Sequence, residues 1–470
     1  MVEIEQLFIS KDCTIKDAML QIQKSGFGTA LVVENRKLLG VVTDGDIRRA
    51  ILEGTPINEK AARIMNSKPI VAGLGTTKRK LLEMMKGKEK GLEPGMYMKI
   101  PIVNEKREVV DLAVFTEIGK KKEPSPLFLT KSDVKRGKLK KILVLGGAGY
   151  LGSVLSRKLL EKKYEVRVLD NLTYGEEGIS ELFGKKGFEF QQGDIRNIHD
   201  VVMAVSGADA VVHLAAIVGD PACKIEPMST IESNYLATKM VAEVCRHHLV
   251  NRFVFASTCS VYGQSETASR EDSETRPLSL YARSKLDSEN ALLEMEDESF
   301  GPAILRLSTL FGLSPRMRFD LVVNTLTAKA IIEGKITIYG GEQYRPLLHV
   351  EDAAEAFIAC IEAPIEKVSG KVFNAGSKGL NVKIIDIGNE VKKAVPHSEL
   401  EISREKVDLR NYFVSFEKIE KELGFTAKKS MKDGITEIKK WIAEKKINNY
   451  WEKKYSNYEY LVNLNNGKGK

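Results

Sequence analysis

Cysteine is scarce in this chain of 470 residues: five cysteines are scattered along it, with no Cys-x-x-Cys pair. This pattern argues against a disulfide framework and a zinc site, so no metal is expected. Long apolar runs are also lacking. No stretch approaches the roughly 18 uncharged residues of a membrane span, and the first residues lack the apolar segment of a signal peptide. We therefore expect a cytoplasmic protein without a membrane partner.

Basic residues exceed acidic ones, and the formal net charge is +8. Much of the excess lies in lysine-rich stretches at residues 120–122, at residues 135–141 and near the C-terminus. No aromatic residues interleave with these lysines to form a nucleic-acid-binding groove, so they are interpreted as solvated linker and tail. The sequence thus predicts no nucleic-acid partner, and its length predicts more than one domain.

Residues 1–121 contain two successive segments with a similar order of predicted elements. The first segment predicts a helix, a strand, a turn at residues 34–36, a second strand and a second helix. The second segment repeats this order and ends in the same strand, turn and strand. Such an internal repeat resembles a pair of CBS motifs, modules that often bind adenosine nucleotides and regulate a fused enzyme.

In the CBS family a threonine, followed three residues later by an aspartate, holds the ribose of the ligand. Thr43 and Asp46 match this pattern in the first repeat, whereas Val114 and Glu117 occupy the equivalent places in the second. The resemblance therefore implies at most one adenine-nucleotide site of this kind. A purely structural or dimerising module is the alternative.

The remainder of the chain divides into three further parts. Residues 122–138 combine proline, serine and charge without periodicity and predict a linker. From residue 139 strands alternate with helices, which predicts an α/β fold with a doubly wound parallel sheet. From about residue 300 to 446 the pattern is more mixed and predicts a smaller substrate lobe. Residues 447–470 are interpreted as a tail that packs on a partner subunit or projects into solvent.

A glycine-rich turn follows the first strand of this sheet. Gly146, Gly149 and Gly152 stand at three-residue spacing, as expected where a tight turn brings the backbone close to a diphosphate. The N–H groups at the start of the following helix would then hold the pyrophosphate. The second strand ends in Asp170, an acid that accepts both ribose hydroxyls of NAD and repels the extra phosphate of NADP. These residues predict a Rossmann fold that binds NAD.

A second marker is the pair Tyr281 and Lys285, which stand four positions apart in a predicted helix and therefore share one face. The lysine charge, together with the positive nicotinamide ring, is expected to lower the pKa of the tyrosine. The tyrosine can then take a proton from a sugar hydroxyl near neutral pH. About 20 residues earlier, a predicted strand ends in the hydroxyl-bearing residues Ser257 and Thr258.

Residues 139–446 resemble the extended short-chain dehydrogenase/reductase family, specifically its NAD-dependent nucleotide-sugar epimerases and dehydratases. The resemblance runs through GGAGYLG, Asp170, GDI, HLAA, NYLAT, STCSVYG, YARSK and RPLLHVEDAAEA. It implies that the cofactor pyrophosphate is contacted by Gly146, Gly149, Tyr150, Leu151 and Gly152. The adenine would lie beside Asp194 and Ile195, and the nicotinamide side of the cofactor beside Leu214, Ala215 and Ala216.

The same resemblance implies three catalytic residues: Thr258 as the catalytic hydroxyl, Tyr281 as the base and Lys285 as the ligand of the nicotinamide ribose. Its substrate, a nucleotide-diphosphate sugar, is expected to contact Arg345 through the diphosphate, with Arg404 or Arg410 in a similar role.

Three positions, Cys259, Ser260 and Thr309, depart from patterns within the family. Cys259 follows the catalytic threonine directly and is a candidate substrate contact, with a buried inert thiol as the alternative. Thr309 stands where the family has an asparagine. The 4,6-dehydratases of the family carry Asp-Glu after the threonine, where this chain has Cys259 and Ser260.

The preferred interpretation is an epimerase that oxidises sugar C4 transiently and returns the hydride to the other face. A keto-sugar reductase that consumes NAD(P)H, or a dehydratase, is the enzymatic alternative. A regulatory protein that only senses NAD or a nucleotide is the non-enzymatic one. The intact set of Thr258, Tyr281 and Lys285 favours an enzyme, and the resemblance implies a homodimer or a higher homo-oligomer.

Overall fold

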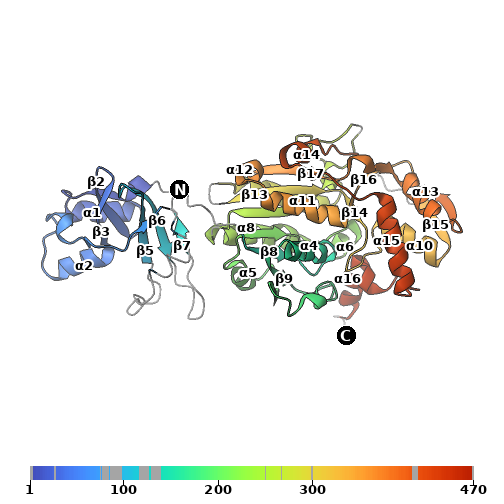
Figure 1. Cartoon of the computed structure of the whole chain (residues 1–470), viewed down its shortest axis with the longest axis horizontal. Helices are drawn as coiled ribbons and strands as arrows, with labels where there is room; N and C mark the ends of the chain where they lie inside the picture. Colours follow the sequence, from blue (N-terminus) through green and yellow to red (C-terminus); the bar gives the residue numbers. More distant parts are fainter. Residues whose placement is uncertain are drawn as a thin grey trace. The chain divides into compact units, whose positions relative to one another are not determined.

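The computed structural model describes residues 4–25, 28–74, 76, 84, 98–115, 126–128, 139–248, 250–265, 267–297, 300–404 and 411–467. The chain forms two compact units, residues 1–138 and residues 139–470 (Figure 1). In the described part of the chain, no helix is both long enough and apolar enough to cross a membrane.

The N-terminal unit begins with one turn of 3-10 helix and two helices around a three-stranded sheet. Its elements are η1 (Ile4–Leu7), β1 (Phe8–Ser10), α1 (Ile15–Ser25), β2 (Thr29–Glu34), β3 (Lys37–Thr43) and α2 (Asp44–Leu52). β1 pairs parallel with β2, and β2 pairs antiparallel with β3. Asn35 and Arg36 between the two strands have positive φ angles of 48° and 63°, as a two-residue hairpin turn requires. The predicted order of helix, strand, turn, strand and helix is confirmed.

A second antiparallel hairpin follows in the same unit. The elements are η2 (Ala61–Arg63), β4 (Ala72–Gly73), β5 (Met98–Val103), β6 (Val109–Phe115) and β7 (Pro126–Phe128). The turns of the two hairpins meet, because the Val109 N–H donates to the Arg36 carbonyl at 2.9 Å. The sequence predicts only a linker over residues 122–138, but β7 lies within it and pairs with β6. Glu117, the side chain of Val114 and the lysine-rich residues 120–122 and 135–138 lie outside the described residues.

The second unit is built on seven parallel strands in the order β10-β9-β8-β11-β12-β13-β17. This order confirms the predicted doubly wound sheet. The strands are β8 (Lys141–Leu145), β9 (Glu165–Asp170), β10 (Phe188–Gln192), β11 (Ala210–His213), β12 (Arg252–Thr258), β13 (Gly301–Leu307) and β17 (Lys371–Ala375). The connecting helical segments are α4 (Tyr150–Glu161), η3 (Ser180–Leu182), α5 (Ile198–Val205), α6 (Asp220–Ile225), α7 (Pro227–Ile231), the π-helical turn η4 (Glu232–Leu236), α8 (Ala237–His247), η5 (Cys259–Tyr262), α9 (Leu280–Glu294) and α11 (Val350–Glu362).

Helices cover both faces of this sheet, because alternate residues of each buried strand point to opposite sides. Ile142 and Val144 of β8 belong to a core with residues of α4 and α11, which lie in front of the sheet in Figure 1. Leu143 and Leu145 belong to a second core with residues of α5, α8 and α9. The near-continuous apolar sequence of the strand is therefore explained by burial on both sides.

A smaller lobe with its own core follows β13. It contains the short sheets β14-β16-β18 and β15-β19 and the helices that pack on them. Its strands are β14 (Thr309–Phe311), β15 (Lys335–Tyr339), β16 (Tyr344–His349), β18 (Asn381–Lys383) and β19 (Glu399–Ser403). Its helices are α10 (Val322–Ile332), α13 (Ile384–Ala394) and α15 (Met431–Glu444). Three short helical segments lie nearby in the chain: α12 (Ile365–Val368), η6 (Lys378–Leu380) and α14 (Glu417–Leu423). The chain returns to the main sheet through β17, a crossing that the mixed sequence pattern does not reveal.

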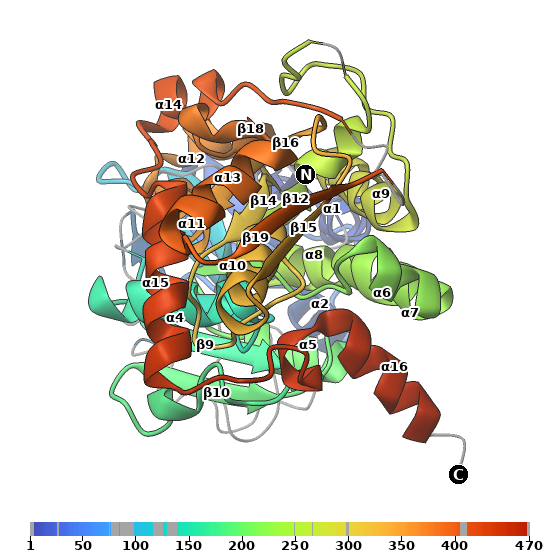
Figure 2. The ribbon, with the colours of Figure 1, turned by 90° about the vertical axis from the view of Figure 1, so that its right-hand side faces the viewer.

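The C-terminal segment contains η7 (Lys453–Tyr455) and α16 (Asn457–Gly467). Tyr450 and Tyr455 are buried, and their rings pack with those of Phe319 and Trp441. The last helix, α16, packs against α6 of the same unit (Figure 2). The prediction of a tail that projects into solvent is therefore wrong for residues 450–461, because Tyr450, Tyr455 and Leu461 are buried within their own unit. Packing of the tail on a partner subunit stays a prediction.

Candidate active site

A cavity of about 840 Å³ lies at the carboxyl ends of strands β8, β9, β11 and β12 and extends into the smaller lobe. The chain runs outward from β8 through β9 to β10 and then crosses back to β11 on the other side of β8. Open parallel sheets bind their ligands at such a switch in strand order. The cavity wall includes all thirteen residues that the sequence predicts for the cofactor: Gly146, Gly149, Tyr150, Leu151, Gly152, Asp170, Asp194, Ile195, Leu214, Ala215, Ala216, Tyr281 and Lys285.

The glycine turn has no room for side chains at two positions. Gly146 has a φ angle of +81°, and a Cβ atom there would lie 2.7 Å from the Ala215 nitrogen. A Cβ atom at Gly152 would collide with the Gly146 carbonyl. Helix α4 begins after Gly149 without a side-chain cap, so the N–H groups of its first turn face the cavity end of the helix. This arrangement suits an anionic ligand.

Asp170 holds the glycine turn against the loop that follows β9. One carboxylate oxygen accepts the Ala148 N–H and the other accepts the Leu172 N–H, both at 2.9 Å. Burial raises the pKa of Asp170, and these two hydrogen bonds oppose the rise. Each oxygen keeps a further lone pair for a ligand hydroxyl.

Asp194 also lines the cavity, and the Arg196 guanidinium donates to its carboxylate at 2.8 Å. Burial on its own raises the pKa of Asp194, but the Arg196 hydrogen bonds outweigh burial and bring the pKa to about 2. Asp194 is therefore ionised throughout the physiological range.

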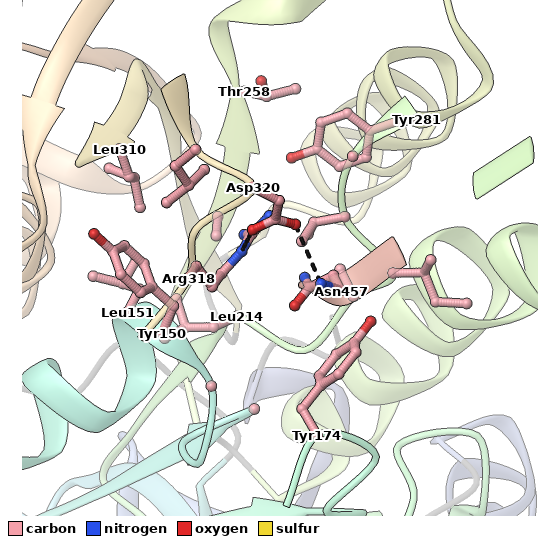
Figure 3. A pocket seen from close by; sticks show the side chains of 18 of the residues that line it. Tyr150, Leu151, Tyr174, Leu214, Thr258, Tyr281, Leu310, Arg318, Asp320 and Asn457 are labelled. Atoms are coloured by element: carbon pink, nitrogen blue, oxygen red, sulfur yellow. Dashed lines mark hydrogen bonds and ion pairs between the residues drawn. The ribbon is translucent and has the colours of Figure 1, made fainter. Parts of the chain in front are cut away.

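Three reactive side chains line one end of the cavity. Thr258 ends β12, and Ser279 caps the start of α9, so that Tyr281 stands in its first turn and Lys285 one turn later (Figure 3). The Ser279 hydroxyl accepts the Ala282 N–H at 3.2 Å. Lys285 is 2% exposed, and its Nζ donates to the Ala256 carbonyl at 2.9 Å. The predicted trio is thus brought together.

Burial is the largest influence on the pKa values of Tyr281 and Lys285. It raises the pKa of Tyr281 above its usual value, Cys223 nearby adds to the rise, and the Thr258 hydroxyl opposes it. Burial lowers the pKa of Lys285 to about 8. The chain's own residues therefore do not produce the predicted lowering of the tyrosine pKa, because burial outweighs them.

A buried ion pair joins α9 to the neighbouring strand β13. Arg306 of β13 donates to Glu289 of α9 at 2.7 Å, and the Ser257 hydroxyl donates to the same carboxylate. Arg306 also donates to the Tyr262 hydroxyl at 2.9 Å. Breaking a buried pair of this kind leaves an uncompensated charge, so the network fixes α9 against β12 and β13.

The structure corrects the prediction for Cys259. The chain turns into η5 directly after Thr258, and the Cys259 thiol donates to the Arg306 carbonyl at 3.2 Å, away from the cavity wall. Its side chain is fully buried, and burial raises its pKa to about 12. The inert-thiol alternative is the correct one. Ser260 lines the cavity instead, with its hydroxyl 3.3 Å from the Tyr412 hydroxyl.

Arg345 lines the cavity from β16, as predicted for a contact with the substrate diphosphate. It is 6% exposed, and its guanidinium lies 5.7 Å from the centre of the Tyr412 ring. Thr309 lines the cavity as well. Arg404 is not among the described residues of the cavity wall, and Arg410 lies outside the described residues.

The loop between β14 and α10 supplies charged residues that the sequence analysis missed. Arg318 pairs with Asp320 at 2.8 Å, and both line the cavity. Arg316 is 4% exposed, and its Nε and Nη2 atoms have no hydrogen-bond partner among the described residues. Burial and Arg318 lower the pKa of Arg316 to about 10, so it is still charged at pH 7. The alternation Arg-x-Arg-x-Asp after a strand is the signal that could have identified this loop.

Thr43 and Asp46 serve the local fold of the N-terminal unit. The Asp46 N–H donates to the Thr43 hydroxyl at 3.2 Å, and the Thr43 N–H donates to the Asp46 carboxylate at 2.9 Å. These two hydrogen bonds form a reciprocal capping box at the start of α2. A second cavity, of about 540 Å³, includes Asp44 and Arg48 in its wall, whereas Thr43 and Asp46 are not part of that wall.

Comparison with known proteins agrees with this geometry. Residues 142–376 match the NAD dependent epimerase/dehydratase family, and residues 4–53 match the CBS domain. The uncharacterized UDP-glucose epimerase YtcB of Bacillus subtilis is 30% identical over 313 residues, which cover 63% of this chain and 96% of that protein. A dTDP-glucose 4,6-dehydratase of Streptomyces niveus is 27% identical over 66% of this chain and 95% of that protein.

A solved structure resembles the second unit. The UDP-glucuronic acid 4-epimerase from Bacillus cereus, in complex with UDP-glucuronic acid and NAD, shares 27% identity and a TM-score of 0.57, over 65% of this chain and 99% of that one. The chain therefore belongs to the NAD-dependent epimerase/dehydratase family and carries a CBS domain at its N-terminus. The resemblance to the nucleotide-sugar epimerases and dehydratases is confirmed. The predicted CBS resemblance is confirmed for the first repeat, and the second repeat stays a prediction.

Proposed function

We propose that the protein is an NAD-dependent nucleotide-sugar epimerase that inverts C4 of the sugar. The observation that carries the proposal is the convergence of Thr258, Tyr281 and Lys285 at one end of a cavity that begins at a glycine turn. Its relatives include a UDP-glucose epimerase and a UDP-glucuronic acid 4-epimerase, and these names support the same chemistry.

The cavity fits NAD. The cradle at Gly146 and Gly152 would be filled by a single Cβ atom. The Nε and Nη2 atoms of Arg316, which have no hydrogen-bond partner among the described residues, offer buried donors to an anion. We assign the pyrophosphate to the glycine turn, the adenosine ribose to Asp170 and the adenine to the wall at Asp194. When bound, NAD supplies the hydride acceptor and donor that an epimerase needs.

Tyr281 is the acid–base residue of the proposed reaction. Its Oη atom takes the proton of the sugar 4-hydroxyl and later returns it, and the Thr258 hydroxyl orients the same oxygen. Lys285, with a pKa of about 8, is mainly charged at pH 7 and favours the phenolate that Tyr281 forms. Arg345 holds the diphosphate of the substrate, so that the sugar stays in place while its C4 is trigonal.

The residues after Thr258 favour an epimerase over a dehydratase. Elimination of water across C5 and C6 needs an acid and a base beside the sugar. Cys259 points away from the cavity, and Ser260 is not a carboxylic acid. A reductase remains the enzymatic alternative, because it needs the same trio.

The test is incubation of the purified protein with UDP-, GDP- and dTDP-sugars, without added cofactor, followed by NMR. A new epimer is the expected result, and it identifies the sugar and its nucleotide in one experiment. A regulatory protein that only senses NAD would give no product under any condition. NADH consumption with a keto-sugar, and no product without cofactor, would replace the epimerase by the reductase.

For the N-terminal unit we infer a dimerising role. Helices α1 and α2 expose apolar side chains, with Leu20 56% and Leu52 80% exposed. A second copy of the chain would cover them, which fits a homodimer. Leu52→Glu is expected to shift the mass measured by light scattering from dimer to monomer, and an unchanged mass would refute this role.

All five cysteines are free thiols, which supports the proposal of a reducing compartment such as the cytoplasm.

A further inference from the structure

The C-terminal segment 450–461, called the strap here, is fastened to the smaller lobe. The Phe319 N–H donates to the Tyr455 carbonyl at 2.8 Å. The Phe319 ring lies edge-on to the rings of Tyr455 and Tyr450, with centroid distances of 5.3 Å and 6.0 Å. The strap is therefore held by a backbone hydrogen bond and an aromatic core before it reaches the cavity.

The strap then forms part of the cavity wall. Asn457 and Leu461 line the cavity and are 3% and 8% exposed. The Asn457 N–H donates to the Asp320 carboxylate at 3.2 Å, shown as a dashed line in Figure 3. The Oδ1 atom of Asn457 is buried and has no hydrogen-bond partner among the described residues. A buried amide oxygen without a partner costs free energy, so a ligand that donates to this carboxamide would recover that cost.

The far end of the strap packs on the cofactor side of the cavity. The rings of Tyr460 and Tyr174 meet edge-on at a centroid distance of 5.5 Å. Tyr174 stands four residues after Asp170, and the Arg316 guanidinium lies 4.6 Å from the centre of its ring. In Figure 3, Asn457 lies between Tyr174 and Tyr281 and faces the cavity. Asn457 lines the same cavity as Asp170 and Tyr281, the two residues between which a dinucleotide would extend.

We propose that the strap closes the cavity over the bound dinucleotide and that Asn457 is a ligand-binding residue for NAD. The inference rests on the proposed function only in taking NAD as the cofactor. The strap lies beyond residue 376, where the match to the family model ends. A closed strap retains NAD between turnovers, which suits a reaction that consumes no cofactor. Release then requires the contacts of Asn457 and Tyr460 to open.

The test uses the full chain loaded with NADH and measures the dissociation rate by stopped-flow fluorescence after excess NAD is added. Asn457→Ala removes one hydrogen bond to the ligand and is expected to speed dissociation about tenfold. Tyr460→Ala loosens the strap and is expected to act in the same direction, whereas Tyr460→Phe keeps the ring and the wild-type rate. The matched control is Tyr458→Ala, on the same helix, where the side chain is 39% exposed.

Unchanged NADH dissociation in both Asn457→Ala and Tyr460→Ala, with an unchanged melting temperature, would overturn the proposal. Weaker binding of UDP with an unchanged NADH rate would also overturn it, because the strap would then serve the substrate. No measurement here requires turnover. Loss of the epimerase assignment in the sugar panel would therefore leave this inference standing, and its failure would leave that assignment standing.

Discussion

The two units differ in how their polar residues are hydrogen-bonded. In the N-terminal unit, Thr43 and Asp46 bond to each other and to the backbone at the start of α2. In the second unit, Arg316 and Asn457 are buried with polar atoms that have no protein partner among the described residues, and both line the cavity. A polar atom whose hydrogen bonds are made within the chain stabilises the fold, whereas a buried polar atom that has no such partner and lines the cavity is a candidate for ligand binding.

Asp170 stands between these two cases. Both of its carboxylate oxygens accept backbone N–H groups, as those of a structural residue do. It nevertheless lines the cavity, and each oxygen retains a lone pair. One residue can therefore shape the glycine turn and still bind a ribose, provided that its remaining lone pairs face open space.

The substitution with the largest expected effect is Tyr281→Phe, in the cavity of the second unit, and the quantity it changes is kcat. Loss of the phenolic proton acceptor should lower kcat about 10³-fold, because general acid–base catalysis contributes on that order. NADH binding, measured by fluorescence, should stay unchanged. The matched control is Tyr164→Phe, which removes a hydroxyl that donates to Glu362 at 3.2 Å on the surface. If Tyr281→Phe kept a tenth of the wild-type activity, Tyr281 would not be the base.

The next effect concerns the pH dependence of stability. Below pH 8 the folded and unfolded chains both carry the Lys285 charge, and the folded chain bears the cost of burying it. Between about pH 8 and its ordinary pKa of 10.5, only the unfolded chain keeps this proton, so stability rises with pH. The wild type should therefore gain about 3 kcal/mol relative to Lys285→Met across this window.

Urea unfolding followed by tryptophan fluorescence measures this gain. Trp441 and Trp451 both lie in the second unit, so the signal reports on that unit alone. Comparison with Lys285→Met subtracts the groups that titrate in both proteins. A constant difference between pH 7 and pH 10.5 would show that Lys285 keeps an ordinary pKa and that its burial costs little.

The parallel sheet and the cofactor wall could be predicted from the sequence, because they depend on local signals. Apolar strands, a glycine turn and an acid at the end of the second strand act within about 30 residues of one another, the length of a single βαβ unit. The pair Tyr281 and Lys285 could be found for the same reason, since one helical turn fixes their common face. Each of these features needs only neighbouring residues to define it.

The outer wall of the cavity could not be predicted, because it depends on contacts between distant segments. Asp320 meets Asn457 across 137 positions of the chain. Their proximity depends on the aromatic core around Phe319, which no periodicity reveals. The prediction that Cys259 contacts the substrate was wrong for a different reason. Cys259 is next to Thr258 in the sequence, but the turn into η5 directs its thiol toward β13. Adjacency in the chain does not determine which way a side chain points.

A smaller effect is expected in the N-terminal unit. Thr43→Ala removes one half of the capping box and should lower the stability of α2 by about 1 kcal/mol. Hydrogen exchange of the α2 amides measures this loss, and epimerase activity should stay unchanged. Binding of an adenine nucleotide at Thr43 and Asp46 stays a prediction. Calorimetry of the full chain with ATP, ADP and AMP tests it. Binding heat that disappears in Thr43→Ala would show that Thr43 also binds a ligand. The contrast between structural polar residues in the N-terminal unit and ligand-binding ones in the second unit would then be wrong.

The smallest effect is expected for Cys259→Ala. The thiol donates to the Arg306 carbonyl and lies away from the cavity wall, so kcat and KM should change by less than about twofold. Burial raises its pKa to about 12, so little thiolate is present for alkylation at neutral pH. Cys13, which is only partly buried, is the internal control in mass spectrometry and should react first. Protection of Cys259 by a bound nucleotide sugar would instead place its thiol at the substrate.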